Sequence, residues 1–329
     1  MGHDHGDHSH EGHGHGGHAG HSHGVSADAD KRWLSIALGL IVVFMAAEVV
    51  VGVVSGSLAL LSDAAHMLTD AASIVLALIA IRLAARPPAG GYTYGLKRAE
   101  ILSAQANGLT LLLLAGWLVY EAIERLIDPP EVAGGLVLVT ALVGIVVNLA
   151  AAWALSRANR TSLNVEGAFQ HILTDLFAFI GTAVAGLVMV LTGFARADAI
   201  ASLFVAALMI KAGIGLVAAS GRILLEAAPA GIDPAALGRH LAEMPQVVEV
   251  HDLHVWQITS GQPAMSAHVL VTPDADCHAV REEIETWLRA EHELDHSTLQ
   301  VDHLESGPAG GEHADEHCAD PHGVVYRQG

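Results

Sequence analysis

Six long apolar stretches, separated by short polar breaks, lie between residues 33 and 219. Each has about the 20 residues that a helix needs to cross a bilayer, so the stretches predict membrane-spanning helices. The breaks are rich in Gly, Pro and Ser, which are typical of turns. We place the spans near residues 33–54, 58–83, 101–124, 133–155, 167–191 and 198–219.

The composition agrees with a membrane protein and excludes several other classes. Apolar residues make up 52% of the chain and charged residues 16%, which is too apolar for a disordered protein. The formal net charge is −19, and a nucleic-acid binder needs a basic surface instead. The two cysteines are too few for a disulfide framework.

The positions of Lys and Arg predict the orientation of the spans, because positive charge stays on the cytoplasmic side. One set of span ends carries only Arg125 and Arg196. The other set carries Lys31, Arg32, Arg82, Arg86, Lys97, Arg98, Arg157, Arg160 and Arg222. We therefore expect a multi-pass protein of the inner (plasma) membrane with both termini in the cytoplasm.

The chain divides into four parts, the second of which is the membrane domain at 31–221. Residues 1–30 are predicted to be a disordered cytoplasmic tail, since residues 1–24 contain nine His and eight Gly without an apolar period. Residues 222–305 change to alternating apolar residues and predict a ferredoxin-like αββαβ domain. Its elements are expected at 234–244, 247–259, 264–271, 276–292 and 298–303. Residues 306–329 are predicted to be a second disordered tail that carries His.

Ionisable residues lie within two of the spans, where they are costly and usually mark a pathway or a site. The second span contains Asp63, His66 and Asp70, and the fifth contains His171 and Asp175. Each His precedes an Asp by four residues, so each pair projects from one helix face. Two such faces packed together would offer two imidazoles and two carboxylates, a set suited to tetrahedral zinc.

Other interpretations of these polar residues stay open. A single intramembrane His is more often a hydrogen-bonded packing residue, and a proton relay without metal is a further alternative. The repeated pattern favours a metal, because four buried ionisable groups need compensation. Asp63 either aids outward release or is a water-exposed carboxylate at a helix end. The remaining polar residues of the spans are interpreted as interhelical hydrogen-bonding or cavity groups, namely Glu48, Asn107, Asn148 and Asp198. Lys211 is interpreted as a snorkelling residue.

Four motifs, in this order, resemble the cation diffusion facilitator family. They are 62–70 (SDAAHMLTD), 92–100 (YTYGLKRAE), the His171 and Asp175 pair, and 251–256 (HDLHVW). The resemblance extends over about residues 30–305. It is greatest to the bacterial zinc, cobalt and cadmium efflux branch.

The resemblance implies a homodimer that exports divalent cations, chiefly zinc and also cadmium and cobalt, in exchange for protons. Such a protein is a secondary active transporter rather than an enzyme, and it has no organic cofactor. The implied ligands of the alternating-access site are His66, Asp70, His171 and Asp175. Proton coupling also follows from chemistry, because an imidazole has a reference pKa of about 6.5 and must be deprotonated to bind a metal.

The same resemblance implies a zinc site in the cytoplasmic domain, with ligands matching His251, His268, His278 and Asp302. Gln300 stands where another His is common, so the site is expected to be weaker or mononuclear. Other donors nearby are His254, His303 and Cys277. The alternative is that these are hydrogen-bonded surface histidines on a small sheet, and Trp256 is interpreted as a core or interface residue.

The loop after the second span departs from the family. Tyr92 and Leu96 stand where imidazoles are expected, so the loop metal site is predicted to be absent. Arg98 and Glu226 match a charge pair that holds the dimer near the membrane surface. Donors in the C-terminal tail have metal-compatible spacing without a predicted scaffold: His313, His317, Cys318 and His322.

A membrane zinc sensor or storage protein is the rival hypothesis. It would bind zinc through the tails and the soluble domain without moving it. A sensor does not need four ionisable ligands at bilayer depth, and this favours transport. None of the six spans contains His-Glu-x-x-His, and the chain lacks a Walker loop, which argues against an intramembrane metalloprotease and an ATP-driven pump. The N-terminal His residues are expected to raise the local zinc concentration, or to be a tolerated solvated segment.

Overall fold

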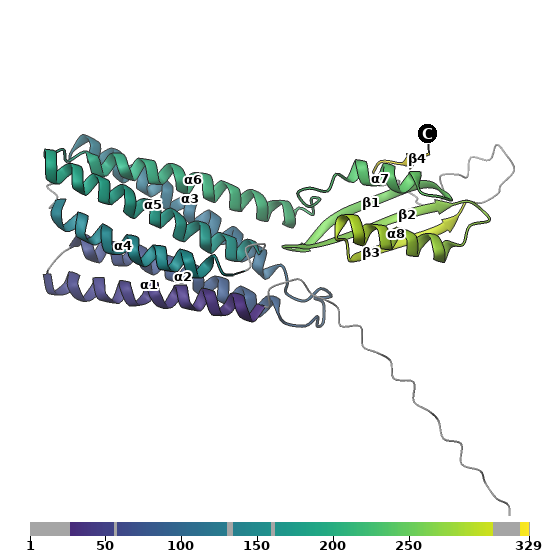
Figure 1. Ribbon diagram of the computed structural model, residues 1–329, viewed down its shortest axis with the longest axis horizontal. Coiled ribbons are helices and arrows are strands. Elements are labelled where there is room, and N and C mark those ends of the chain that lie inside the picture. Colours follow the sequence, from purple (N-terminus) through teal and green to yellow (C-terminus); the bar gives the residue numbers. More distant parts are fainter. Residues whose placement is uncertain (1–26, 56–57, 130–133, 159–161, 305–322, 329) are drawn as a thin grey trace, which may run out of the picture.

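The computed structural model describes residues 27–55, 58–129, 134–158, 162–304 and 323–328. It contains a bundle of long helices and, beyond one end of the bundle, a smaller α/β domain (Figure 1). Most of both predicted tails lies outside the described ranges, including His313, His317, Cys318 and His322.

The bundle has a helix at each of the six predicted spans. The helices are α1 (Ala27–Ser55), α2 (Leu58–Ala84), α3 (Ala99–Ile127), α4 (Gly134–Leu155), α5 (Leu163–Thr192) and α6 (Ala197–Leu224). Within the described ranges, α3 to α6 are each long and apolar enough to cross a membrane. Several helices begin earlier than predicted, as α5 does at Leu163. Apolar sequence marks the depth of the bilayer, whereas backbone hydrogen bonding continues into the polar residues beyond it.

The two helices that carry the predicted ligands, α2 and α5, are joined by a buried apolar cluster. Met67 and Ile74 of α2 and Ile172 of α5 belong to it, together with residues of α1 and α4 such as Leu34 and Leu155. All five side chains are at most 4% exposed. The cluster therefore holds the α2 and α5 faces against each other.

Helices α3 and α6 cross closely at two glycines. A Cβ atom on Gly213 of α6 would lie 2.8 Å from Leu112 Cγ and 3.0 Å from the carbonyl oxygen of Gly108 on α3. Small residues permit this approach of two backbones in a membrane bundle. Any residue with a Cβ atom at position 213 would therefore clash with α3.

The C-terminal domain has the predicted αββαβ order. Its elements are α7 (Pro234–Glu243), β1 (Val247–Thr259), β2 (Gln262–Val271), α8 (Cys277–His292) and β3 (His296–His303). Strand β1 pairs with β2 in antiparallel and β2 with β3 in parallel register. Residues of both helices and the strands share one core, including Leu237, Leu241, Met265, Ile284 and Leu288.

A fourth strand, β4 (Tyr326–Arg327), lies within the stretch 306–329 for which the sequence predicts no regular structure. It pairs with β1 in antiparallel register and gives the sheet the order β3-β2-β1-β4. Two residues are too few for an alternating pattern to reveal a strand. The sheet is therefore wider than predicted.

The turn between β1 and β2 contacts the helical bundle. The Leu163 backbone N–H, at the start of α5, donates to Ser260 Oγ at 3.2 Å. The Thr259 hydroxyl donates to the carbonyl oxygen of Lys97 at 3.2 Å, and Lys97 Nζ donates to Gln262 Oε1 at 2.7 Å. The C-terminal domain thus reaches the loop before α3 and the first residue of α5.

Candidate metal site in the membrane domain

Three of the four predicted intramembrane ligands come together between α2 and α5. His171 Nε2 contacts Asp70 Oδ1 directly and lies 3.8 Å from Asp175 Oδ2. One donor atom from each residue lies within 4.8 Å of the others. The predicted convergence of the two helix faces is therefore present for Asp70, His171 and Asp175.

The cluster is largely shielded from solvent. The His171 side chain is 4% exposed, Asp70 15% and Asp175 25%. Two carboxylates at a buried imidazole favour a bound positive charge, which either a proton or a metal ion can supply. His171 Nδ1 is buried, and the described residues give it no hydrogen-bond partner. The arrangement is suited to exchanging one cation for another.

The fourth predicted ligand, His66, lies on α2 four residues before Asp70, and its side chain is outside the described part of the structure. The same holds for the side chains of Asp63, Glu48 and Asp198. The helical repeat places the Cα atoms of His66 and Asp70 on one face of α2. The participation of His66 stays a prediction.

The remaining polar residues of the bundle differ in their contacts. Asn148 Nδ2 donates to the Gly144 carbonyl oxygen at 3.1 Å, which is a bond within α4 and not between helices. Asn107 on α3 is buried, and its Oδ1 has no hydrogen-bond partner among the described residues. Its Nδ2 lies close to α5, 3.3 Å from where a Cβ of Gly167 would stand. Lys211 is exposed.

The predicted charge pair is formed within one chain. Arg98 Nη2 donates to Glu226 Oε1 at 3.1 Å, and the side chains are 39% and 64% exposed. An exposed pair of this kind contributes at most about 1 kcal/mol. It joins the start of α3 to the segment that follows α6.

Two predicted ligands of the C-terminal domain face each other across β1 and β2. His251 pairs in register with His268, and their ring centroids are 5.3 Å apart at 82°. His268 Nε2 lies 4.0 Å from Asp252 Oδ2, and His254 Nε2 lies 2.9 Å from Asp252 Oδ1. Imidazole nitrogens are suitable zinc donors, but among the described residues no third donor lies at metal-binding spacing with this pair.

The other predicted ligands of this domain do not join that pair in one chain. Asp302 Oδ2 accepts from Gln300 Nε2 at 2.8 Å, and His278 is exposed in the first turn of α8. Cys277 Sγ lies 3.5 Å from His303 Nε2, which also contacts the Ala275 carbonyl oxygen. Over the described ranges, the membrane cluster is the one group of three donors with metal-binding spacing.

Sequence reasoning missed the carboxylate that contacts His251. Glu249 Oε1 lies 3.0 Å from His251 Nδ1, although the angle is not that of a hydrogen bond. The only sequence signal was the spacing of two residues, which places Glu249 and His251 on the same face of β1.

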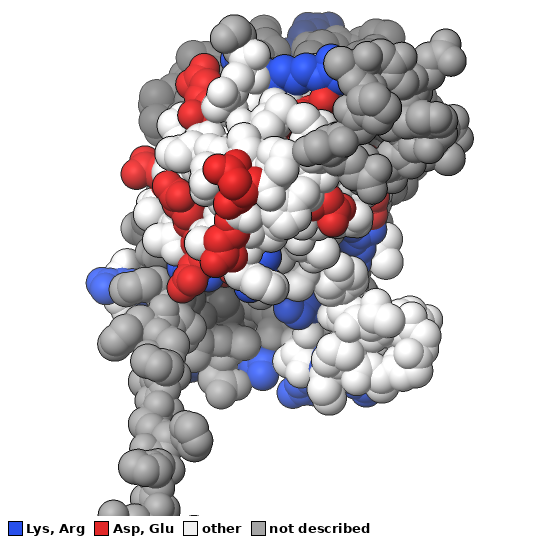
Figure 2. All heavy atoms as spheres, turned by 90° about the vertical axis from the view of Figure 1, so that its right-hand side faces the viewer, with Lys and Arg blue, Asp and Glu red and all other residues white. Residues whose placement is uncertain are grey.

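Acidic side chains gather on the end of the molecule formed by the C-terminal domain (Figure 2). Helix α8 contributes the exposed Glu282, Glu283 and Glu291. A surface with this charge raises the local concentration of cations.

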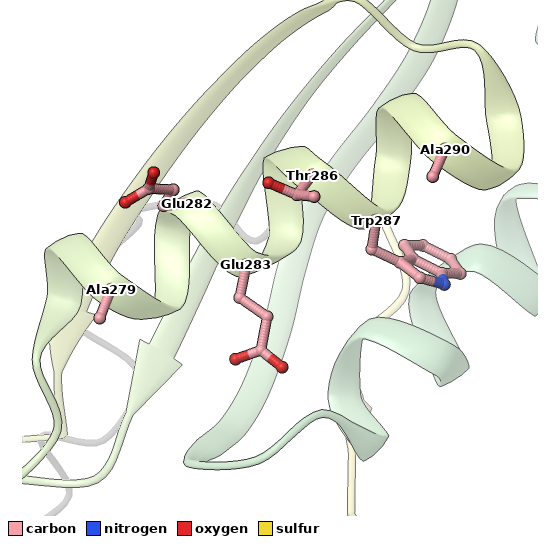
Figure 3. A pocket seen from close by; sticks show the side chains of 6 residues that line it. All are labelled: Ala279, Glu282, Glu283, Thr286, Trp287 and Ala290. Carbon is pink, nitrogen blue, oxygen red and sulfur yellow. The ribbon is translucent and has the colours of Figure 1, made fainter.

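A surface hollow follows one side of α8 (Figure 3). Its described lining residues are Ala279, Glu282, Glu283, Thr286, Trp287 and Ala290. Trp287 stacks on His240 of α7 with ring centroids 4.2 Å apart and planes at 6°. This lining offers carboxylates without an imidazole, so it does not form a mixed nitrogen and oxygen site.

Comparison with known proteins gives consistent matches along the chain. A sequence model of the cation efflux transmembrane domain matches residues 34–225, and one of the cation efflux protein cytoplasmic domain matches residues 229–304. The zinc transporter ZitB of Escherichia coli (strain K12) is 37% identical over 297 residues, which cover 87% of this chain and 95% of the relative. The cadmium, cobalt and zinc/H(+)-K(+) antiporter of Bacillus subtilis (strain 168) is 39% identical over 280 residues, covering 84% and 89%. The cation efflux system protein CzcD of Alcaligenes sp. (strain CT14) is 36% identical over 277 residues, covering 83% and 87%.

Proposed function

Because the chain belongs to the cation efflux family, we propose that it exports zinc, and also cadmium and cobalt, from the cytoplasm in exchange for protons. The relatives are named a zinc transporter and a cadmium, cobalt and zinc antiporter, which supports divalent cations as substrates. The protein is a multi-pass membrane transporter and not an enzyme in the ordinary sense. We further propose that it lies in the inner membrane with both termini in the cytoplasm.

The convergence of Asp70, His171 and Asp175 is the observation that carries this proposal. Their donor atoms lie within 4.8 Å of one another inside an apolar bundle. Mixed imidazole and carboxylate donors suit zinc better than manganese or magnesium, which prefer oxygen ligands. His66, one turn before Asp70, would complete a tetrahedral set.

Metal and protons compete for the same side chains. A protonated His171 is neutralised by Asp70 and Asp175, whereas a neutral His171 has a lone pair for zinc. Zinc entering from the cytoplasm therefore displaces protons, and protons entering from outside displace zinc. When the site between α2 and α5 opens in turn to the cytoplasm and to the outside, this competition exchanges zinc for protons across the membrane.

We also propose that the protein works as a homodimer, as expected for a chain with this cytoplasmic domain. The Arg98 and Glu226 pair would then help to hold the dimer near the membrane surface. In the C-terminal domain, His251 and His268 would form the first half of a zinc site. Asp302 and the exposed His278 would join it through a rearrangement or from the second protomer.

Zinc-driven proton flux in proteoliposomes tests the transport proposal. The intact chain is expected to acidify or alkalinise the lumen according to the direction of the zinc gradient, as reported by a trapped pH dye. Asp70→Asn and Asp175→Asn are expected to abolish the flux. Glu121→Gln is a matched control, because this carboxylate pairs with Arg125 in α3 and lies outside the cluster.

The rival sensor or storage hypothesis gives a different result. Zinc would bind to the intact chain in detergent, yet neither zinc nor protons would cross the liposome membrane. That outcome, with correctly folded protein, would overturn the transport proposal.

A further inference from the structure

The C-terminal strand β4 lies beyond the part of the chain that the family's cytoplasmic domain covers, which ends at residue 304. It returns to the edge of β1, where Tyr326 pairs with Val250 and Arg327 with Glu249. Gln328 Nε2 also reaches the Met244 carbonyl oxygen at 3.4 Å. This strand is therefore an addition to the domain, docked on the strand that carries His251.

The docking has a specific side-chain contact. The ring of Tyr326 lies directly over Gly238 of α7, where a Cβ atom would be only 2.4 Å from Tyr326 Cε2. Tyr326 is thereby packed against the domain core. The absence of a side chain at Gly238 makes room for the ring, which fixes the position of Arg327 beside it.

Arg327 and His251 share one carboxylate. Arg327 Nε donates to Glu249 Oε2 at 2.6 Å, while Glu249 Oε1 lies 3.0 Å from His251 Nδ1. The Glu249 side chain is 13% exposed and His251 9%, whereas Arg327 is 62% exposed. A nearly buried carboxylate thus connects a tail residue to an imidazole that faces His268.

We propose that β4 positions His251 for metal binding: Arg327 holds the Glu249 carboxylate 3.0 Å from Nδ1 of His251, where it would accept from Nδ1–H of the metal-bound ring and leave Nε2 as the metal-binding nitrogen. Carboxylates that orient a histidine ligand in this way typically change metal affinity by about 10–100-fold. The inference rests on the proposed zinc site of the C-terminal domain. Arg327 and Glu249 are positioning residues and do not themselves bind the metal.

Zinc affinity in the full-length protein tests this role. The starting protein carries Asp70→Asn and Asp175→Asn, so that the membrane cluster is disabled. Zinc binding is measured by competition with a chromophoric chelator. The same measurement on the protein that also carries His251→Ala is subtracted, which leaves the zinc binding that depends on His251. Arg327→Ala and Glu249→Gln are each expected to weaken this part by about tenfold.

Coupling distinguishes positioning from a general loss of stability. If Arg327 acts through Glu249, the double variant Arg327→Ala with Glu249→Gln binds zinc no more weakly than Glu249→Gln alone. Arg327→Lys should keep most of the affinity, since it retains a positive donor. Arg281→Ala is the matched control, because Arg281 pairs with Glu285 on α8 in the same domain and should leave zinc affinity unchanged.

Hydrogen exchange reports the docking without any metal. Removal of residues 323–329 and, independently, Gly238→Ala should each speed amide exchange at 249–250 in β1. Unchanged exchange in both would overturn the docking. An unchanged or higher zinc affinity in Arg327→Ala would overturn the positioning role alone. Absence of any His251-dependent zinc binding would overturn the zinc site of the domain together with it, whereas the transport proposal is tested separately at Asp70 and Asp175.

Discussion

His171 on α5 and Asp70 on α2 contact each other through Nε2 and Oδ1 although 101 residues separate them in the chain. Asp175, one turn after His171, lies at the longer distance of 3.8 Å. The imidazole is thus the member of the cluster that lies next to both carboxylates.

Replacement of the central imidazole should change which metal is carried. His171→Asp leaves a site dominated by oxygen donors, which favour manganese over zinc. We expect zinc flux to fall at least tenfold and manganese flux to rise relative to zinc, measured in proteoliposomes with each metal in turn. A variant that keeps the original preference would show that His171 does not set selectivity.

Zinc binding at the membrane cluster should strengthen as the pH rises. The ligands must lose protons to bind metal, so acidification favours the protonated, metal-free site. Calorimetry in two buffers with different ionisation enthalpies should register proton release with zinc binding. His251→Ala is a suitable background, since it limits binding in the C-terminal domain. A zinc-binding enthalpy that is the same in both buffers would contradict competition between zinc and protons for the site.

The glycine crossing of α3 and α6 gives a stability prediction with an internal control. Gly213→Ala would place a Cβ 2.8 Å from Leu112 Cγ, so we expect a loss of about 1–3 kcal/mol from overpacking. Gly215→Ala, two residues along the same helix, meets no atom within 4 Å and should be neutral or stabilising. Thermal unfolding in detergent measures both. Equal effects would mean that the crossing is not tightly packed.

The exposed charge pair near the membrane surface should contribute little to the stability of one protomer. Arg98→Glu or Glu226→Arg alone is expected to change the free energy of unfolding by about 1 kcal/mol or less. The double swap, Arg98→Glu with Glu226→Arg, should restore the starting value if the two groups interact. A dimer that dissociates in either single variant and re-forms in the swap would support the proposed role in assembly, measured by light scattering of the detergent complex.

Much of this architecture follows from sequence patterns that depend on local spacing. Apolar length indicates where the helices cross the bilayer, and alternation indicates β1, β2 and β3. The His171 and Asp175 pair was identifiable because a spacing of four residues places both on one helix face. Helix ends such as Leu163 were less predictable, because hydropathy marks the bilayer and not the last helical hydrogen bond.

The features that sequence did not predict are pairings between distant residues. Arg327 and Glu249 are 78 residues apart, and their contact depends on Tyr326 fitting over Gly238. A two-residue strand has no periodicity of its own. The contact of Glu249 with His251 has a local signal, because a spacing of two residues places both on one face of β1.

The contact of Ser260 with Leu163 has a consequence for turnover. Leu163 and His171 lie on one continuous helix, about 12 Å apart along its axis. A rigid tilt of α5 that turns His171 toward the other side of the membrane must also displace Leu163 from a hydroxyl held on the turn after β1. In the proposed cycle, the turn at Ser260 would therefore be a part of the C-terminal domain that a movement of α5 reaches directly.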